Sequence, residues 1–519
     1  MEQAQRHYEQ LHKRSREART LSSVAALLDW DHETYMPSDG AGIRAEQLEL
    51  LAGIIHAKKT GKPFASSLAK LINIETGQVL APELNEAQRA ALREWRRDYL
   101  LDKALPKRFV EKLAKLTSQA MNVWRHARQQ DAFQQFAPYL DQLVKMQRKK
   151  AEYFGYKEHP YDALLNQYEH GATTAEISTL FSSLRSSLTP FIKQVAASQS
   201  CDDHFLFGTF DQEQQLKFSR ELLKEMQYDM KKGRLDLSAH PFSTSMHPSD
   251  SRITTRIHPT GLFSNISAVM HETGHALYEM NLPAEHYGSP LGEAISLGMH
   301  ESQSRWWETL IGHSKPFWQR YLPLLKQHFK SQLDHVSLDA FYRAINKVNP
   351  SYIRIEADEA TYGLHVILRF ELERALIEGS LKVRDVPEAW NAQMKDLLGV
   401  TPPTNREGCL QDIHWAMGAF GYFPTYTLGN LYASHLFLGF ARDFPNWKEK
   451  LTAEGLGFIK EWLAKSVHRH GRRYTSKELL QQVAGKPFSA DAFIQYLTGK
   501  YGELCKTSAN RSQECCSIH

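Results

Sequence analysis

The chain has 519 residues, of which 42% are hydrophobic and 24% charged, with a formal net charge of +4 and five cysteines. These are ordinary values for a globular protein, and the positive net charge is too small to indicate a nucleic-acid or anionic-membrane partner. No apolar run reaches the roughly 18 residues of a membrane span, the first residues are polar, and an odd number of cysteines favours a reducing compartment. We therefore predict a cytoplasmic protein.

Helical periodicity dominates the chain. Apolar residues within 177–188 repeat at three- and four-residue spacing, and Thr173 with Glu176 predicts a capping box at the start of that helix. The best strand candidate is the β-branched run at 252–258, which we expect to form a small sheet beside the following helix. The helical pattern returns at 458–463. These patterns predict a mainly α fold.

No internal repeat or linker divides the chain, so we predict a single domain over residues 1–505. From Lys506 to His519 the sequence is polar and lacks helical periodicity, which predicts a disordered tail beyond the packed domain. Short basic runs occur at 148–150 and 468–473. We interpret both runs as solvated helix faces.

The most informative motif is His271-Glu272-Thr273-Gly274-His275. On a helix it places two imidazoles one turn apart with a carboxylate beside them, the arrangement of a zinc site with its own base. A catalytic zinc takes a third protein ligand, and Glu301 is the candidate, on a second helix after the breaks at 281–283 and 288–290.

This ligand set indicates hydrolytic chemistry. Zinc held by His271, His275 and Glu301 would lower the pKa of a bound water toward about 7, and Glu272 would act as general base. Two imidazoles and a carboxylate would also accept Co²⁺ or Mn²⁺. A sheet edge beside the metal would let a peptide substrate lie extended.

Beyond this site, the chain resembles the carboxypeptidase Taq family of metallocarboxypeptidases, over about residues 5–502. The resemblance rests on six motifs in order, similar to the family's HPF, DxRxT, HExxH, HES/GQ, IRxxAD and GxxQDxHW signatures. They are His240-Pro241-Phe242, Asp250-Ser251-Arg252-Ile253-Thr254, the histidine motif, His300-Glu301-Ser302-Gln303, Ile353-Arg354-Ile355-Glu356-Ala357-Asp358 and Gly408-Cys409-Leu410-Gln411-Asp412-Ile413-His414-Trp415. Thr273 and Met280 depart from frequent family residues, which leaves the ligands unchanged.

The resemblance implies a helical zincin with a long central cleft, a homodimer, and removal of single residues from free peptide C-termini with proline disfavoured. It implies that Arg354 clamps the terminal carboxylate, since a guanidinium can bind a carboxylate through two parallel hydrogen bonds. It also implies substrate contacts by His240 and Tyr426, with Tyr422 as the alternative to Tyr426. Three further polar residues are candidates to orient the ligands: Asp358, Asp412 and His414.

Two other functions remain open. The helical zincin framework equally permits a zinc endo-oligopeptidase or dipeptidyl carboxypeptidase. Only the carboxylate-clamp motifs argue against these activities. A non-catalytic peptide-binding protein with structural zinc is the other alternative. Glu272 and the three-ligand set argue against it, because a structural zinc normally has four protein ligands.

Overall fold

The protein is mainly α-helical with one small sheet, as the sequence predicts. The computed structural model describes the backbone of residues 2–199 and 201–516 and the side chains of residues 2–199 and 201–505. The α-helices are α1 (Glu2–Thr34), α2 (Ala41–Thr60), α3 (Lys62–Ala69), α4 (Glu86–Ala104), α5 (Lys107–Gln129), α6 (Phe133–Phe154), α7 (Pro160–Leu165), α8 (Thr174–Ser198), α9 (Gln212–Glu225), α10 (Leu262–Met280), α11 (Leu297–Arg305), α12 (Lys315–His328), α13 (Lys330–Leu333), α14 (Leu338–Ala344), α15 (Glu359–Glu378), α16 (Val386–Leu398), α17 (Pro424–Asp443), α18 (Trp447–Glu454), α19 (Gly457–Ser466), α20 (Ser476–Ala484) and α21 (Asp491–Cys516). The strands are β1 (Leu235–Leu237), β2 (Ser243–His247) and β3 (Asp250–Thr255). A π-helix, η5 (Trp306–Ile311), directly follows α11, and the 3₁₀ helices include η6 (Arg354–Glu356) and η8 (His468–Arg473).

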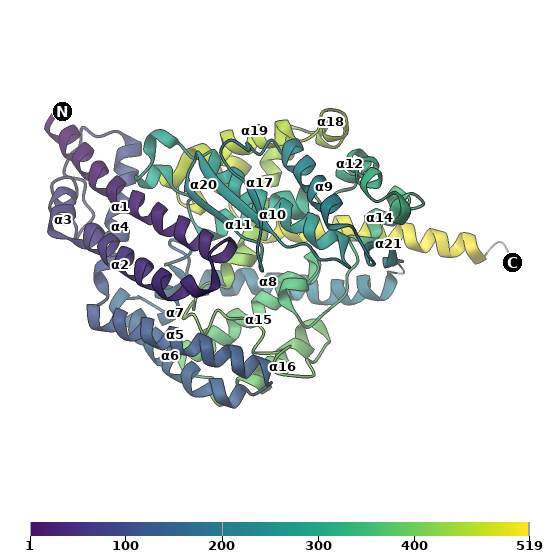
Figure 1. Cartoon of the computed structure of the whole chain (residues 1–519), viewed down its shortest axis with the longest axis horizontal. Coiled ribbons are helices and arrows are strands. Elements are labelled where there is room, and N and C mark those ends of the chain that lie inside the picture. Colours follow the sequence, from purple (N-terminus) through teal and green to yellow (C-terminus); the bar gives the residue numbers. More distant parts are fainter. Residues whose placement is uncertain (1, 200, 517–519) are drawn as a thin grey trace.

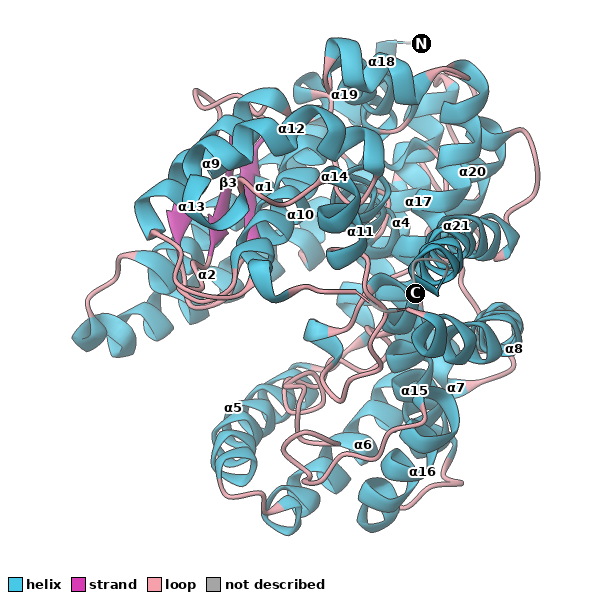
Figure 2. Cartoon of the chain, turned by 90° about the vertical axis from the view of Figure 1, so that its right-hand side faces the viewer, coloured by secondary structure: helices cyan, strands magenta, loops and turns pink. Residues whose placement is uncertain are grey.

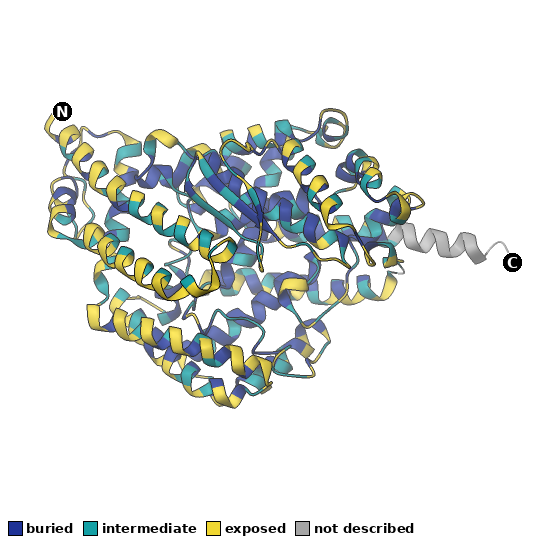
Figure 3. Ribbon diagram, in the orientation of Figure 1, coloured by how far each residue is buried: buried dark blue, intermediate teal, exposed yellow. Residues whose placement is uncertain are grey.

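The elements form two lobes. Figure 2 shows α10, α11 and α17 in the upper lobe together with the sheet, and α5, α6 and α16 in the lower lobe. Helices α1 and α2 run side by side along the upper lobe (Figure 1). One cluster of buried hydrophobic side chains extends in sequence from Phe109 to Leu504 and so belongs to both lobes (Figure 3). A second, smaller cluster joins the N-terminal helices, from Ala4 to Tyr99, with Leu291. The single domain predicted over residues 1–505 stays a prediction.

Helix α8 illustrates how the sequence forms these helices. The hydroxyl of Thr173 accepts the backbone N–H of Glu176, and the Glu176 carboxylate accepts that of Thr173, which confirms the predicted capping box. Ile177, Phe181 and Leu184 are 2%, 2% and 0% exposed. Their spacing puts them on one face, and burial of each side chain contributes roughly 1.5–3 kcal/mol.

The sheet lies against the helix that carries the histidine motif. Strand β3 is central, with β1 parallel on one side and β2 antiparallel on the other, so that Ser243 pairs with Ile253. The strand predicted at 252–258 is confirmed with shifted boundaries, because the neighbouring strand β1 ends at Leu237, which pairs with Thr255, the last residue of β3. Both β2 and β3 pack on α10. Among the described residues β2 pairs with no strand other than β3, so its other edge is unpaired, and α1 also contacts this strand.

The interpretation of the basic run 468–473 as a solvated face is wrong for Arg472. This residue is 8% exposed, and its guanidinium donates to Glu94 and Asp98 of α4, each at 2.7 Å. A short basic run does not reveal acidic partners on a helix far away in sequence. Arg472 therefore ties η8 to the N-terminal helices.

Helix α21 continues as backbone to Cys516, past the domain end predicted at residue 505. The side chains from Lys506 onward and residues 517–519 lie outside the described residues, so the predicted disordered tail stays a prediction. Cys201, Cys409 and Cys505 are free cysteines. Within the described residues, no helix is long and apolar enough to cross a membrane.

Candidate metal centre and active site

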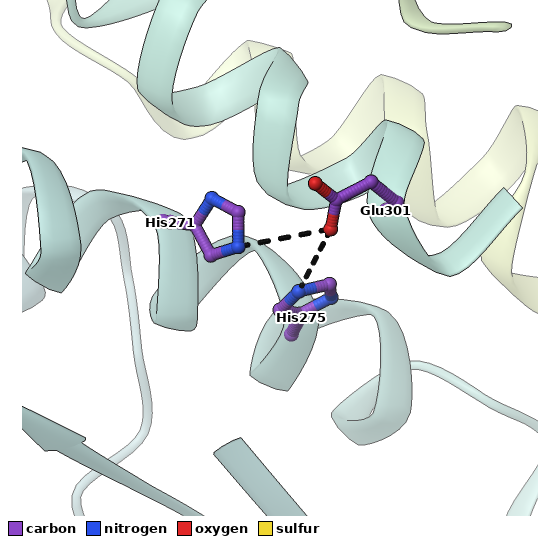
Figure 4. Close-up of side chains that lie close together, drawn as sticks. All are labelled: His271, His275 and Glu301. Atoms are coloured by element: carbon purple, nitrogen blue, oxygen red, sulfur yellow. Dashed lines mark ion pairs between the residues drawn. The ribbon is translucent and has the colours of Figure 1, made fainter. Parts of the chain in front are cut away.

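Helices α10 and α11 bring the three predicted metal ligands together. His271 and His275 lie one turn apart on α10, as the motif predicts. Glu301 projects from α11, whose first turn is capped by the Ser296 hydroxyl accepting the N–H of Met299 at 3.0 Å. The Glu301 Oε2 atom lies 3.7 Å from Nε2 of His271 and 3.4 Å from Nε2 of His275 (Figure 4).

Two glycines permit the close approach of the helices around Glu301. A Cβ atom at Gly274 of α10 would lie 2.5 Å from the carbonyl oxygen of Gln303 on α11. One at Gly429 of α17 would lie 2.4 Å from Cγ of Glu301. Only a residue without a side chain fits at either position. Both glycines therefore help to set the distance between Glu301 and the histidines.

The three side chains fit a divalent cation. Their donor atoms all lie within 4.8 Å of one another. Ligands at about 2.0–2.1 Å from a tetrahedral ion are separated by roughly 3.4 Å, close to the two distances above. Both histidines turn Nε2 toward Glu301, so one site can take both nitrogens and the carboxylate oxygen.

The opposite nitrogen of each histidine is held by a hydrogen bond. Nδ1 of His271 lies 2.8 Å from Oε2 of Glu308, which also accepts from Arg305 at 2.7 Å. Nδ1 of His275 lies 2.6 Å from Nδ1 of His300, whose Nε2 lies 2.9 Å from the Glu279 carboxylate. Partners of this kind fix the ring orientation of metal-binding histidines.

Sequence reasoning missed Glu308 and Glu279. Glu279 lies four residues after His275 on the same helix, a spacing that could have indicated a neighbour on the same face. Glu308 had no such signal, because it lies on the π-helix η5, and helical periodicity does not predict a π-helix.

Burial disfavours the charged form of every titratable group of the site, but the direction in which each pKa shifts also depends on the neighbouring charges. At His271, the carboxylates of Glu301 and Glu308 outweigh burial and raise the pKa to about 9. At His275 burial dominates and lowers the pKa to about 4. The carboxylates thus favour a positive charge at this position, which a divalent cation would supply.

Glu272 lies beside the ligands, is 8% exposed, and interacts with Ser243 of the edge strand β2. Burial raises the pKa of its carboxyl group to about 7. A carboxyl group with a pKa near 7 can take up and release a proton near neutral pH, as a general base requires.

Arg354, the predicted carboxylate clamp, lies in a buried polar cluster. It is 5% exposed, and its Nε and Nη2 atoms donate to Oδ1 of Asp412 at 3.1 and 2.8 Å. Nη1 donates to the hydroxyl of Tyr362 at 3.1 Å. Arginine has five N–H donors, so one remains on each terminal nitrogen.

The structure brings Tyr426 to this cluster but not His240. The Arg354 guanidinium lies 4.6 Å from the centre of the Tyr426 ring, whose hydroxyl lies 3.1 Å from Nε2 of His414. Tyr422, the alternative, packs against Tyr426 with 5.3 Å between ring centres. His240 is exposed in the turn before β2, and no hydrogen bond among the described residues joins its ring to Arg354 or Tyr426.

The prediction that Asp358, Asp412 and His414 orient the metal ligands is wrong. Asp358 accepts the N–H groups of Ala360 and Thr361 and so caps α15. Asp412 and His414 belong to the Arg354 cluster. Glu308 and His300 contact the ligands instead, because η5 and α11 pack directly on α10.

Two side chains connect the candidate metal ligands to the Arg354 cluster. Arg305, which holds Glu308, lies with its guanidinium 5.0 Å from the centre of the Tyr362 ring. The hydroxyl of that tyrosine in turn accepts from Arg354. The two groups of predicted site residues are therefore adjacent parts of one site.

The profile of the carboxypeptidase Taq (M32) metallopeptidase family matches residues 10–501. The chain belongs to this family. It is 40% identical to thermostable carboxypeptidase 1 of Thermus thermophilus, over 96% of this chain and 98% of that protein. It is 37% identical to carboxypeptidase 1 of Bacillus subtilis, over 93% of this chain and 95% of that protein. Membership of the family makes this protein a metallopeptidase, a hydrolase of peptide bonds.

Solved structures of the M32 family share the fold over nearly the whole length. An M32 carboxypeptidase from Deinococcus radiodurans superimposes with a TM-score of 0.93 at 36% identity, covering 96% of this chain and 99% of that one. Metallocarboxypeptidase 1 of Trypanosoma cruzi gives 0.90 at 34% identity, with the same coverage. The predicted family and the helical fold class are thus confirmed.

Proposed function

We propose that this protein is a metal-dependent carboxypeptidase that removes single amino acids from the free C-terminus of peptides. The family match and the carboxypeptidase names of its relatives support the activity. The observation that carries the finer proposal is a buried guanidinium, that of Arg354, with unused N–H donors beside the candidate metal ligands. An endopeptidase needs no such group.

His271, His275 and Glu301 would hold the metal, which we propose to be zinc. The same donors would also accept cobalt or manganese. A divalent cation at this position polarises a carbonyl group and lowers the pKa of water. Glu272 takes the proton of the attacking water and passes it to the amine that leaves.

Arg354 binds the terminal carboxylate of the substrate through its two free N–H groups. Tyr426, whose hydroxyl is positioned by His414, contacts the C-terminal residue, with Tyr422 as the alternative. We retain His240 as a substrate contact, reached by a peptide lying along the free edge of β2. That edge begins at Ser243, which interacts with Glu272, so an extended peptide there has its backbone next to the base.

One experiment tests the proposal. A mixed-sequence peptide, as free acid and as C-terminal amide, is incubated with enzyme that has been chelated and resupplied with zinc or cobalt, and the products are weighed by mass spectrometry. We expect a metal-dependent ladder of single residues lost from the free acid alone. Internal cuts in both forms would instead show an endo-oligopeptidase, loss of dipeptides a dipeptidyl carboxypeptidase, and no cutting a peptide-binding protein.

Three further expectations remain proposals. Light scattering of the purified protein tests the homodimer. Peptides that differ only by proline at the cleaved position test whether proline is disfavoured. Fractionation of the native cell tests the cytoplasmic location.

A further inference from the structure

We propose that Arg369 is a positioning residue that makes the Arg354 cluster cationic and thereby selects substrates with a free C-terminal carboxylate. The inference rests on the proposed function, because it concerns how the same site recognises the end of a peptide. No sequence motif pointed to Arg369.

The Asp412 carboxylate bridges the two arginines. Its Oδ1 atom accepts from Nε and Nη2 of Arg354, at 3.1 and 2.8 Å. Its Oδ2 atom accepts from Nε of Arg369 at 2.6 Å. The side chains of Arg354, Arg369 and Asp412 are only 5%, 0% and 10% exposed. Water therefore screens this group of charges weakly.

The group holds two cations and one anion. Although burial opposes its charge, the guanidinium groups of Arg369 and Arg354 hold the pKa of Asp412 far below its usual range. Burial lowers the pKa of Arg369 to about 10, which leaves it charged at neutral pH. The three residues thus carry a net charge of one positive unit, and a buried charge without a counterion is unfavourable.

Neighbouring titratable groups leave this excess in place. Burial lowers the pKa of His414 to about 4 and that of His365 well below its ordinary value, so both imidazoles are neutral near pH 7. Glu373, also on α15, interacts electrostatically with Arg369. Burial raises the pKa of its carboxyl group to about 7, so it is mostly uncharged below pH 7, and within the described part of the chain it forms no ion pair with Arg369. Its oxygens accept instead from Tyr161, Trp415 and the N–H of Gly421.

A substrate carboxylate would supply the missing negative charge. Arg354 offers two remaining N–H donors, the number that a carboxylate accepts in a forked pair. Without Arg369, the charge of Asp412 would neutralise that of Arg354. An incoming carboxylate would then be attracted by Arg354 but repelled by Asp412. Arg369 cannot reach the substrate itself, because it is fully buried with its guanidinium 4.5 Å from the centre of the Trp390 ring. It acts through Asp412.

The test compares Arg369→Met, which removes the charge at similar length, with Arg369→Lys, which keeps it. For each metal-loaded variant, kcat/KM is measured on one peptide as free acid and as C-terminal amide, and folding is checked by circular dichroism. We expect Arg369→Met to reduce the ratio of free-acid to amide kcat/KM by at least about tenfold, through KM for the free acid, and Arg369→Lys to restore most of it. A merely structural role would lower both rates together and leave the ratio unchanged, which would overturn the inference.

Wild-type enzyme and Arg354→Ala separate this inference from the proposed function. If the wild type cleaves both forms of the peptide equally, the proposed function itself fails. If the wild type prefers the free acid and Arg354→Ala loses that preference while Arg369→Met keeps it, only the role of Arg369 fails. If Arg369→Met does not fold, Asp412→Asn tests the same inference, because it preserves the side-chain volume and removes one negative charge, which raises the net charge of the group by one unit. We expect its KM for the free acid to fall relative to the amide, and an unchanged or higher KM would reject the charge argument.

Discussion

Replacement of Glu308 by glutamine tests whether this residue orients His271, the first candidate metal ligand. Glu308 accepts hydrogen bonds from Ser267 at 2.9 Å, from Arg305 at 2.7 Å and from Nδ1 of His271 at 2.8 Å. Glutamine preserves the volume but removes the charge, and its amide group places an N–H donor where the carboxylate has an acceptor. If the amide nitrogen takes the place of Oε2, both Arg305 and His271 lose their acceptor, and if it takes the place of Oε1, Ser267 does. In either case the charge of Arg305 loses its counterion.

The expected loss is in metal affinity. A hydrogen bond to a charged group contributes about 1.5–3 kcal/mol, against about 1 kcal/mol for a neutral one, so His271 is held less firmly by roughly 0.5–2 kcal/mol. Loss of such a partner typically weakens metal binding by about 10–100-fold. We therefore expect Glu308→Gln to bind zinc at least about tenfold more weakly than the wild type, with kcat recovered in part at saturating zinc.

Competition with a chelating dye at fixed pH measures the zinc affinity. Glu46→Gln is the matched control, because Glu46 is exposed on α2, far from the ligands in sequence. Glu279→Gln, which acts on His275 through His300, should lower the affinity as well. Wild-type affinity in Glu308→Gln would refute the idea that this hydrogen bond stabilises the site.

Four further predictions concern single side chains. Glu272→Gln should retain zinc while kcat falls at least about 100-fold, and substantial turnover in a variant with full metal content would place the base elsewhere. Arg354→Ala should raise KM for free-acid peptides about tenfold or more and leave amidated ones little changed, whereas equal effects on both would contradict the clamp. Gly429→Ala should lower the free energy of unfolding by about 1–3 kcal/mol, since its Cβ would lie 2.4 Å from Cγ of Glu301. Denaturant unfolding measures this change, with Gly53→Ala as the control, because nothing lies within 4 Å of a Cβ added at Gly53. Equal changes in the free energy of unfolding of the two variants would disprove the packing argument. Burial raises the pKa of Glu373 from 4.5 to about 7, so its protonated form stabilises the fold fully below pH 4.5 and this stability is lost as pH rises to 7. Between pH 4.5 and 7 the free energy of unfolding of the wild type should therefore fall by on the order of 3 kcal/mol because of this group, and Glu373→Gln should not show this fall. The same pH dependence in both proteins would contradict the prediction.

The local part of the site can be predicted from the amino-acid sequence alone. His271, Glu272 and His275 take their relative positions from the period of one α-helix, which the neighbouring apolar residues already indicate. The capping box at Thr173 and the strand before α10 are equally local, because their hydrogen bonds join residues close in sequence. The order of the motifs indicated the family, and the place of Glu301 on a second helix after the breaks already made it the candidate third ligand.

The polar groups that support these residues could be identified only in the folded molecule. Glu308 reaches His271 from a π-helix, and Asp412 joins Arg354 to a second arginine on α15 instead of orienting the metal ligands. Arg472, which the sequence predicts to be solvated, forms ion pairs with acidic side chains of α4. Each of these contacts depends on how two distant segments pack and on which side chain then faces which. Periodicity along the chain contains no information about that, since it fixes the face of a helix but not its neighbour.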